Sequence, residues 1–420
     1  MSTDVDLLWV LLCSALVFLM QAGFLMLESG LTRRKNSVNV AIKNLSDFCM
    51  ASVAFWLVGY GLMFGASSSG WVGTSSFIPD FVATDHLEGA FFLFQLMFCG
   101  TAVTIMSGAV AERMRFSSYL LIAVWISALV YPVIGHWSWA GLLQGEANGW
   151  LNSDGFIDFA GSTVVHSTGG WASLAILIVI GPRIGRYSSS GEPQRIPGSN
   201  VSQATVGAVL LFIGWLGFNG GSTLALNETV PGILINTIIG ASAGAISAGF
   251  LGQAVQNRVN ASQFINGCLG GLVAVTANCA FVSTPVAALI GFIGGMVVIA
   301  VEQLLERYRI DDAVGAIPVH LGAGIWGTLA VALYGDPELL GTGLDRLEQL
   351  AVQVTGIIAC GVWVFGATYV FTLAINRISP LRVPAEHELL GLNVSEHDER
   401  EDIGHLPDGT GREENSTICE

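Results

Sequence analysis

Stretches of about 20 predominantly apolar residues recur along almost the whole chain, and each could cross a hydrocarbon core of ~30 Å as a helix. They lie at 7–28, 40–65, 89–110, 118–139, 159–181, 200–221, 229–251, 263–281, 285–305, 314–334 and 350–376. Apolar residues make up 52% of the chain and charged residues only 12%, whereas about a quarter of an average soluble domain is charged. The sequence therefore predicts an all-α, multi-pass membrane protein with eleven transmembrane helices. A count of ten stays open, because 263–281 is short and rich in glycine.

Lys and Arg residues test this count independently, because they are retained in short cytoplasmic loops. All but one fall in alternate loops or after the last stretch, in the order Arg33, Arg34, Lys35 and Lys43; Arg113 and Arg115; Arg183, Arg186 and Arg195; Arg258; Arg307 and Arg309; Arg377, Arg382, Arg400 and Arg412. Arg346 alone lies on the other side. The alternation predicts eleven helices with the N-terminus outside and the C-terminus in the cytoplasm. Asp4 and Asp6 stand where a cleaved signal peptide would be basic, so we expect the first stretch to remain a membrane helix.

One nine-residue pattern occurs twice, as DFAGSTVVH in Asp158–His166 and as DAVGAIPVH in Asp312–His320. In the predicted topology the first copy runs inward from the outer face, and the second runs outward from the inner face. Each His follows its Asp by eight residues, or about 12 Å of helix, so both imidazoles should lie near the middle of the membrane. Inverted repeats that meet at a midplane site are a recurring transporter plan. We expect repeat halves at about 1–181 and 200–334, with 350–376 as an added helix in the membrane domain 1–376.

Two facing imidazoles can ligate a metal or haem, relay a proton, or line a pore. A zinc site usually needs three or four ligands, and no other His, Cys or carboxylate recurs at this depth, so we expect no metal. A membrane redox protein with a bis-histidine haem is a weaker alternative, because the residues around His166 and His320 are small and rich in glycine. Asp158 and Asp312 also suit the capping of free amides at a helix start.

Aromatic side chains occur near the predicted outer ends of 118–139 and 200–221, and also within 89–110. Trp139 lies in HWSWAG, Phe98 in FQLMFCG, and Trp215, Phe218 and Ser222 in GWLGFNGGS. A ring face attracts a desolvating cation by about 0.5–2 kcal/mol, and the acidic outer loops would draw a cation toward this face. The interfacial aromatic belt explains most tryptophans equally well. The pattern supports a cation substrate only together with the histidine pair.

These segments, with AVAERMRF at 109–116 and GIWGTL at 324–329, resemble the ammonium transporter family (Amt/Mep/Rh), and specifically its Amt branch. The resemblance covers residues 1–382. It implies a homotrimer of eleven-helix protomers in the plasma (inner) membrane, each with a pore that takes up ammonium or methylammonium as a nitrogen source. It implies neither an enzyme nor a cofactor, and no feature predicts contact with nucleic acid.

The resemblance also implies roles for particular residues. Trp139, Phe98 and Ser222, supported by Asp158, resemble the outer recruitment site; Phe98 and Phe218 resemble a stacked gate; His166 and His320 resemble the twin-histidine pair; Trp215 and Asn219 are supporting residues. Ammonium would lose its proton at the outer site and cross as ammonia, with coupled and electrogenic proton transfer. An ammonium sensor and an electroneutral, Rh-type gas channel remain alternatives, the latter disfavoured by Trp139 and Ser222.

The segment 377–420 differs in composition, with eleven acidic residues against four arginines. It predicts an acidic cytoplasmic tail whose last twenty or so residues are disordered. In the family this region contacts neighbouring subunits and PII-type regulatory proteins. The familiar stretch G-L-D-x-x-x-H-G appears here with Gly391, Leu392, Asn393, His397 and Asp398, so two positions depart from it. A PII-type partner is therefore a weaker expectation than the pore.

Overall fold

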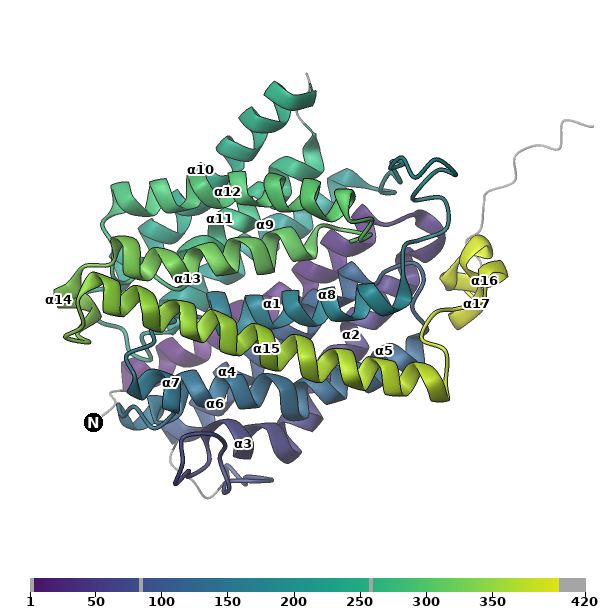
Figure 1. Ribbon diagram of the computed structural model, residues 1–420. Coiled ribbons are helices and arrows are strands. Elements are labelled where there is room, and N and C mark those ends of the chain that lie inside the picture. Colours follow the sequence, from purple (N-terminus) through teal and green to yellow (C-terminus); the bar gives the residue numbers. More distant parts are fainter. Residues whose placement is uncertain (1–3, 83–85, 257–259, 400–420) are drawn as a thin grey trace, which may run out of the picture.

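The computed structural model describes residues 4–82, 86–256 and 260–399, which form one bundle of helices running side by side (Figure 1). Ten helical segments are long and apolar enough to cross a membrane: Asp4–Leu31, Arg34–Phe64, His86–Ala109, Phe116–Gln144, Ser162–Ile180, Val201–Gly221, Val230–Ala254, Thr284–Arg307, Ile317–Tyr334 and Arg346–Ile378. One further crossing, the eighth in chain order, is α11 (Ala261–Thr276), which is apolar but has only 16 residues. The predicted all-helical membrane fold is confirmed, and the short crossing is the one that left the count open.

Several crossings contain more than one helical element. The second comprises α2 (Ser37–Ala54), a π-helical turn η2 (Phe55–Gly59) and α3 (Tyr60–Phe64), and the fourth comprises α5 (Phe116–Trp125), η3 (Ile126–Val130) and α6 (Tyr131–Trp139). Six other crossings are single helices. They are α1 (Asp4–Leu31, first), α4 (His86–Ala109, third), α9 (Val201–Gly221, sixth), α10 (Val230–Gln256, seventh), α12 (Thr284–Arg307, ninth) and α15 (Arg346–Ile378, last). The fifth and tenth begin with π-helical turns, η5 (Ser162–Ser167) before α8 (Thr168–Ile180) and η6 (Ile317–Gly322) before α13 (Ala323–Tyr334).

The first helices of the two halves, α1 and α9, pack against each other in opposite directions. A Cβ added at Gly217, near the end of α9, would lie 2.5 Å from Leu16 Cβ in the first half of α1. A Cβ at Gly30, near the end of α1, would lie 2.6 Å from the backbone nitrogen of Ala204 near the start of α9. Small residues let membrane helices approach this closely. This antiparallel pairing is the arrangement that an inverted repeat requires.

The two ends of the bundle carry different short elements (Figure 1). The short helices α7 (Trp150–Ser153) and α14 (Pro337–Leu340) lie at one end, called here the loop side. The helices α16 (Ala385–Leu390) and α17 (Leu392–His397) lie at the other end, called here the tail side. The long α15 runs across the bundle between the two ends. Which side faces the cytoplasm stays a prediction from the basic residues.

The first part of the acidic tail is folded against the bundle. Asn393 accepts a hydrogen bond from the Asn39 amide at 3.0 Å and donates one to the Arg34 carbonyl at 3.0 Å. The Leu392 amide donates to Asn36 Oδ1 at 2.8 Å. An aspartate at position 393 could not donate to Arg34, so the departure from the family stretch has a use here. The segment expected to be disordered, from about 400 onward, lies outside the described residues.

One expectation about the loops is wrong. Lys43, counted among the basic residues of the first loop, lies inside α2 and is 0% exposed. Helix α2 begins at Ser37, directly after the short turn η1 (Arg34–Asn36), so the loop ends six residues before Lys43. The Lys43 ammonium donates to the Met114 carbonyl at 2.7 Å. The other basic residues of this loop, Arg33, Arg34 and Lys35, still precede the helix.

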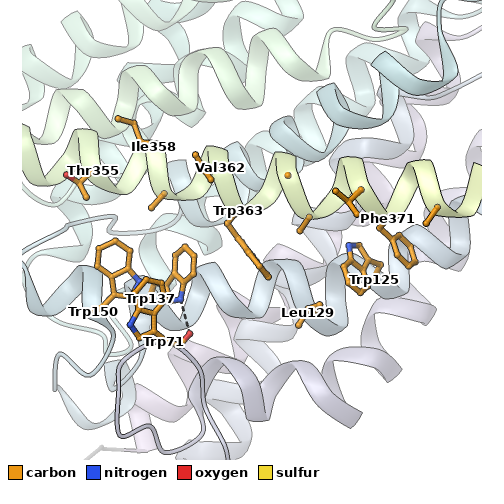
Figure 2. A pocket seen from close by; sticks show the side chains of 15 residues that line it. Trp71, Trp125, Leu129, Trp137, Trp150, Thr355, Ile358, Val362, Trp363 and Phe371 are labelled. Atoms are coloured by element: carbon orange, nitrogen blue, oxygen red, sulfur yellow. Dashed lines mark hydrogen bonds between the residues drawn. The ribbon is translucent and has the colours of Figure 1, made fainter.

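A cavity of ≈ 980 Å³ lies on the outside of the bundle, between α15 and the fourth crossing. Figure 2 shows Trp71, Trp137 and Trp150 together at one end of it and Trp125 beside Phe371 at the other. Its α15 wall is apolar and open, with Val362 72% exposed. An exposed apolar groove of this kind suits lipid chains or apolar helices, and Trp rings at one end fit the interfacial belt. It contains no residue of the repeated pattern.

Candidate functional site

The two copies of the nine-residue pattern fold alike. Each aspartate precedes a π-helical turn that carries the histidine, His166 in η5 and His320 in η6. The Asp158 carboxylate accepts from the amides of Gly161, Ser162, Thr163 and Val164, and the Asp312 carboxylate from those of Val314, Gly315 and Ile317. The predicted capping role of both aspartates is confirmed. Single π-helical turns often mark functional sites, because they reorient a side chain out of the regular helix.

The turns bring the two histidines together. His166 Nδ1 lies 3.2 Å from His320 Nδ1, and the ring centroids are 5.2 Å apart with an interplanar angle of 23°. Both side chains are buried, at 0% and 4% exposure. One ring nitrogen must donate the hydrogen bond and the other accept it. This direct bond leaves no space for a metal ion between the two nitrogens, which argues against the haem alternative.

A column of aromatic rings leads from the loop side to this pair. Trp139 meets Phe98 edge to face at 6.1 Å, and Phe98 stacks on Phe218 at 3.9 Å with an angle of 17°. Phe218 in turn lies 5.4 Å from the His166 ring. Trp215 covers the same imidazole at 4.9 Å and 17°. The residues proposed for a recruitment site, a gate and a histidine pair therefore follow one another in space.

A cavity of ≈ 470 Å³ opens at the loop-side end of this column. Its described lining includes Trp139, Asp158 and Ser222, but neither Phe98 nor Phe218. Trp139 Nε1 donates to the Asp158 carbonyl at 2.8 Å, and Ser222 Oγ donates to the Phe218 carbonyl at 2.8 Å. The Asp158 carboxylate is already committed to backbone amides. The carboxylate therefore shapes the cavity wall, while the backbone carbonyl of Asp158 holds Trp139. The Trp139 ring and the Ser222 hydroxyl offer the surface that a bound ligand would contact.

The two supporting residues on α9 anchor that helix to its neighbours. Trp215 Nε1 donates to Thr276 Oγ1 at 2.8 Å, which fixes the indole over His166. Asn219 Nδ2 donates to Thr237 Oγ1 on α10 at 2.9 Å. Trp215 is thus in direct ring contact with the pair, whereas the described contact of Asn219 joins two helices.

Sequence reasoning missed two contacts of this site. Phe24 on α1 lies 6.1 Å from the His320 ring, and Thr163 Oγ1 lies 2.6 Å from Thr328 Oγ1 across the two halves. Phe24 and Thr328 lie outside the repeated pattern, and Thr163 stands where the second copy has Ile317. The repeat in the sequence therefore gave no signal for these contacts. It did carry a signal for Glu28 and Asp47, which are ionisable residues inside apolar stretches, and such residues are usually functional.

Comparison with known proteins agrees with this geometry. A sequence profile described as the Ammonium Transporter Family matches residues 8–402. A putative ammonium transporter of Synechocystis sp. is 49% identical over 399 residues, which cover 94% of this chain and 74% of the relative. Ammonium transporter Amt2 of Archaeoglobus fulgidus is 39% identical, covering 94% and 87%. The solved structure of a Sensor Amt Protein is 40% identical, with a TM-score of 0.91 over 94% of this chain and 98% of that one. This chain is a multi-pass membrane protein of the ammonium transporter family.

Proposed function

We propose that this protein transports ammonium by taking a proton from it at the loop-side cavity and passing ammonia along the aromatic column to the histidine pair. The observation that carries the proposal is the unbroken succession from Trp139 through Phe98 and Phe218 to His166 and His320. It joins a cation-attracting surface to a buried polar pair through apolar rings.

The stacked rings set the need for deprotonation. Phe98 and Phe218 are both about as buried as a side chain can be, at 1% and 0% exposure, and their centroids lie 3.9 Å apart. An ion that passes such rings loses its hydration, and an uncompensated buried charge is very costly. Neutral ammonia carries a far smaller penalty. Ammonium can therefore enter by giving up a proton, whereas potassium has none to give.

The histidine pair suits ammonia and its proton together. An imidazole nitrogen can accept a hydrogen bond from ammonia or, when protonated, donate one. Ammonium yields one ammonia and one proton, and the hydrogen-bonded nitrogens of His166 and His320 offer that proton a path through the same constriction. If both species cross, one positive charge crosses per ammonium. The proposed transport is therefore electrogenic.

The assembly and its partners follow from the family rather than from the site. We propose a homotrimer in the plasma membrane, with nitrogen uptake as its role. A PII-type regulatory protein at the tail side is a further proposal, on a surface that includes α16 and α17. Asn393 makes it weaker, because the family stretch has Asp at this position.

A second candidate function is ammonium sensing. It is favoured by the likeness to the Sensor Amt Protein, which is 40% identical with a TM-score of 0.91. A sensor would use the same cavity to bind ammonium but would pass no substrate. Transport measurements distinguish the two functions, because binding alone gives no sustained flux.

The test is an ammonium-evoked current in proteoliposomes containing the full chain, with potassium as the control cation. A saturating current with ammonium and none with potassium is expected. His166→Ala and His320→Ala should each abolish it or admit potassium, while His387→Ala on the short helix α16 should not. Internal alkalinisation without current would indicate electroneutral ammonia conduction. Binding with neither signal would favour the sensor and contradict transport.

A further inference from the structure

Four ionisable side chains are buried away from the aromatic column. Glu28 on α1 is 2% exposed, and Lys43 and Asp47 on α2 and Tyr119 on α5 are each 0% exposed. All four lie within helical segments that could cross a membrane. Charged groups at such depth are costly and usually serve transport or proton movement. The proposed function uses none of them.

Glu28, Asp47 and Tyr119 belong to two adjoining hydrogen-bonded clusters, here called the network, which join four helices through Ser107 and Tyr119. Glu28 Oε2 accepts from Asn44 Nδ2 at 2.8 Å and from the hydroxyl of Ser107. Asn44 Nδ2 also lies 3.2 Å from Ser107 Oγ. The Asp47 carboxylate accepts from Thr104 Oγ1 at 3.1 Å and from the hydroxyl of Tyr119. Lys43, which donates to the Met114 carbonyl, lies one helical turn before Asp47. With Lys43 and both carboxyl groups ionised, this region carries one net negative charge that a single proton would neutralise.

The Glu28 carboxyl lies next to the segment that carries His320, on its tail side. Phe24, whose ring is 6.1 Å from the His320 ring, precedes Glu28 by four residues, or about 6 Å of helix. At Gly108 of α4, a Cβ would lie 3.0 Å from Glu28 Cδ and 2.5 Å from Val314 Cγ2. Val314 belongs to the turn between Asp312 and His320. Gly108 therefore lets α1 and this turn come together around the carboxyl group.

Two buried polar atoms within the network have no hydrogen-bond partner among the described residues. They are Asn44 Oδ1 and Gln21 Nε2. Gln21 shares the hydroxyl of Thr104 with Asp47, at 2.9 Å from its own Oε1. Buried polar atoms are nearly always satisfied, if not by protein then by ordered water. Water bound to these two atoms would lie within the network, close to both carboxyl groups.

One face of α2 continues the polar path to the tail side. Asn39, Lys43 and Asp47 are spaced by four residues and so share a helix face. Asn39 Nδ2 lies 2.9 Å from His397 Nε2 on α17, and His397 is partly exposed. Polar groups thus extend from Asp47, deep in the bundle, to an imidazole at the surface.

We propose that Glu28 accepts the proton from the histidine pair and that the polar face of α2 carries it on to the tail side. Protonated His320 gives a proton, through water, to the Glu28 carboxylate, which leaves a neutral imidazole and a carboxylic acid. The acid then releases the proton along the path, and the carboxylate is restored. The titratable groups facing this route are His320, Asp312, Lys43, Asp47, Tyr119, Arg113, Glu396 and His397. The inference rests on the proposed electrogenic transport and assigns the proton a route apart from that of ammonia.

The test compares Glu28→Gln with wild type in proteoliposomes, measuring both ammonium-evoked current and internal alkalinisation. Gln keeps the size of the side chain but cannot carry the proton. The current should fall by at least about tenfold, as for the loss of a proton-transfer group. Ammonia that still enters without its proton should then alkalinise the lumen more than in wild type, where the proton enters too. Glu28→Asp, which keeps a carboxyl group, should retain the current. Glu302→Gln on α12, which removes a carboxyl bonded to Gln263, is the matched control and should behave as wild type.

Each other outcome decides against the inference. A Glu28→Gln protein with wild-type current and pH profile would overturn it. So would loss of current with no alkalinisation in a protein that elutes as wild type does, because the carboxyl would then serve the ammonia path itself. If the wild-type protein itself gave alkalinisation but no current, it would conduct ammonia without a proton, and no proton route would be needed. Wild type with neither signal would mean that the proposed function has failed, whatever the variant does.

Discussion

The two copies of the repeated pattern share a backbone but not their surroundings. Both place a capping aspartate before a π-helical turn with histidine at the same register. The Asp158 copy is covered by rings, since Trp139 bonds to the Asp158 carbonyl and Trp215 and Phe218 stack near His166. The ring beside His320 is the tilted Phe24. The repeated pattern supplies a near-symmetric pair, and the unequal neighbours distinguish its loop-side copy from its tail-side copy.

The residue before each aspartate shows the same contrast. Ile157 is held by a neutral amide, with its N–H and C=O bonded to Gln353 at 2.9 and 2.7 Å. Asp311 is held by charge, with Arg183 donating to its carboxylate at 2.8 and 2.9 Å and Arg113 bonding its carbonyl. One turn is therefore fixed by hydrogen bonds without net charge, and the other by ion pairs. These differences can be tested separately.

The largest effect is expected from removing the capping aspartates. Asp158 accepts four amides and is 5% exposed, and each buried amide left unpaired costs about 1–3 kcal/mol. Asp158→Ala should therefore lose at least about 4 kcal/mol of stability on that scale and nearly all transport. Asp312 is less buried, so water can replace it and Asp312→Ala should cost less. Thermal melting and methylammonium uptake would measure both; equal losses would remove the contrast.

The ion pairs of Asp311 should give the tail-side turn its own pH dependence. Burial alone would raise the pKa of Asp311, but the Arg183 hydrogen bonds and the nearby charge of Arg113 bring it below its ordinary value. Because the folded-state pKa is depressed, this contribution is complete above the unfolded value of about 3.9 and is lost as the pH falls below it. Asp311→Asn should cost about 3 kcal/mol at neutral pH.

Melting curves of wild type and Asp311→Asn between pH 8 and strongly acidic buffer would check this. The difference between them should be constant down to about pH 4 and then shrink. Ile157→Val, at the equivalent position of the other copy, should give a difference that does not change with pH. A gap between wild type and Asp311→Asn that closes already near neutral pH would contradict the ion-pair account.

A smaller effect is expected from the rings beside the histidines. The Trp215 indole covers the His166 imidazole at 4.9 Å. Trp215→Leu removes this cover and should lower transport by about tenfold, because the imidazole is then misplaced. Phe24→Leu removes a tilted contact at 6.1 Å and should lower transport much less. The current is divided by the amount of folded protein, which thermal melting measures. This separates an effect of a misplaced imidazole from an effect of weaker packing. The reverse order of effects would place the critical imidazole on the other copy.

The smallest effect concerns the contact that the halves share. Thr163 Oγ1 and Thr328 Oγ1 lie 2.6 Å apart and are both buried. Thr163→Val and Thr328→Val should each cost about 1 kcal/mol, and the double variant little more than one of them, because both remove the same bond. A double-mutant cycle by thermal melting measures this coupling. Full additivity would mean that the two hydroxyls do not depend on each other.

The sequence predicted the fold well because the bilayer imposes simple rules. Span length follows from membrane thickness, and the repeated register of Asp158 and His166 with Asp312 and His320 was enough to bring two imidazoles together. The alternation of basic residues remained informative although it misplaced Lys43. A lysine six residues into a helix is indistinguishable from a loop lysine when only its charge is counted.

Contacts between halves could not be predicted, because they depend on how helices rotate about their axes. Phe24 meets His320 only because α1 packs close to the second half, and the apolar stretch 7–28 gives no preferred face. The polar face of α2 was in principle readable. Asn39, Lys43 and Asp47 recur every four residues, a spacing that indicates one helix face inside a membrane segment.

The antiparallel pairing of α1 with α9 also bears on how the protein is made. Helix α1 ends at Leu31, and its closest partner begins at Val201, about 170 residues later. At a synthesis rate of about 5–20 residues per second, the first helix waits on the order of ten to thirty seconds for that partner. During this interval its glycine-lined face has only lipid or an insertion factor to cover it. A chaperone or a quality-control protease would therefore bind this face most readily while only the first half of the chain has been made.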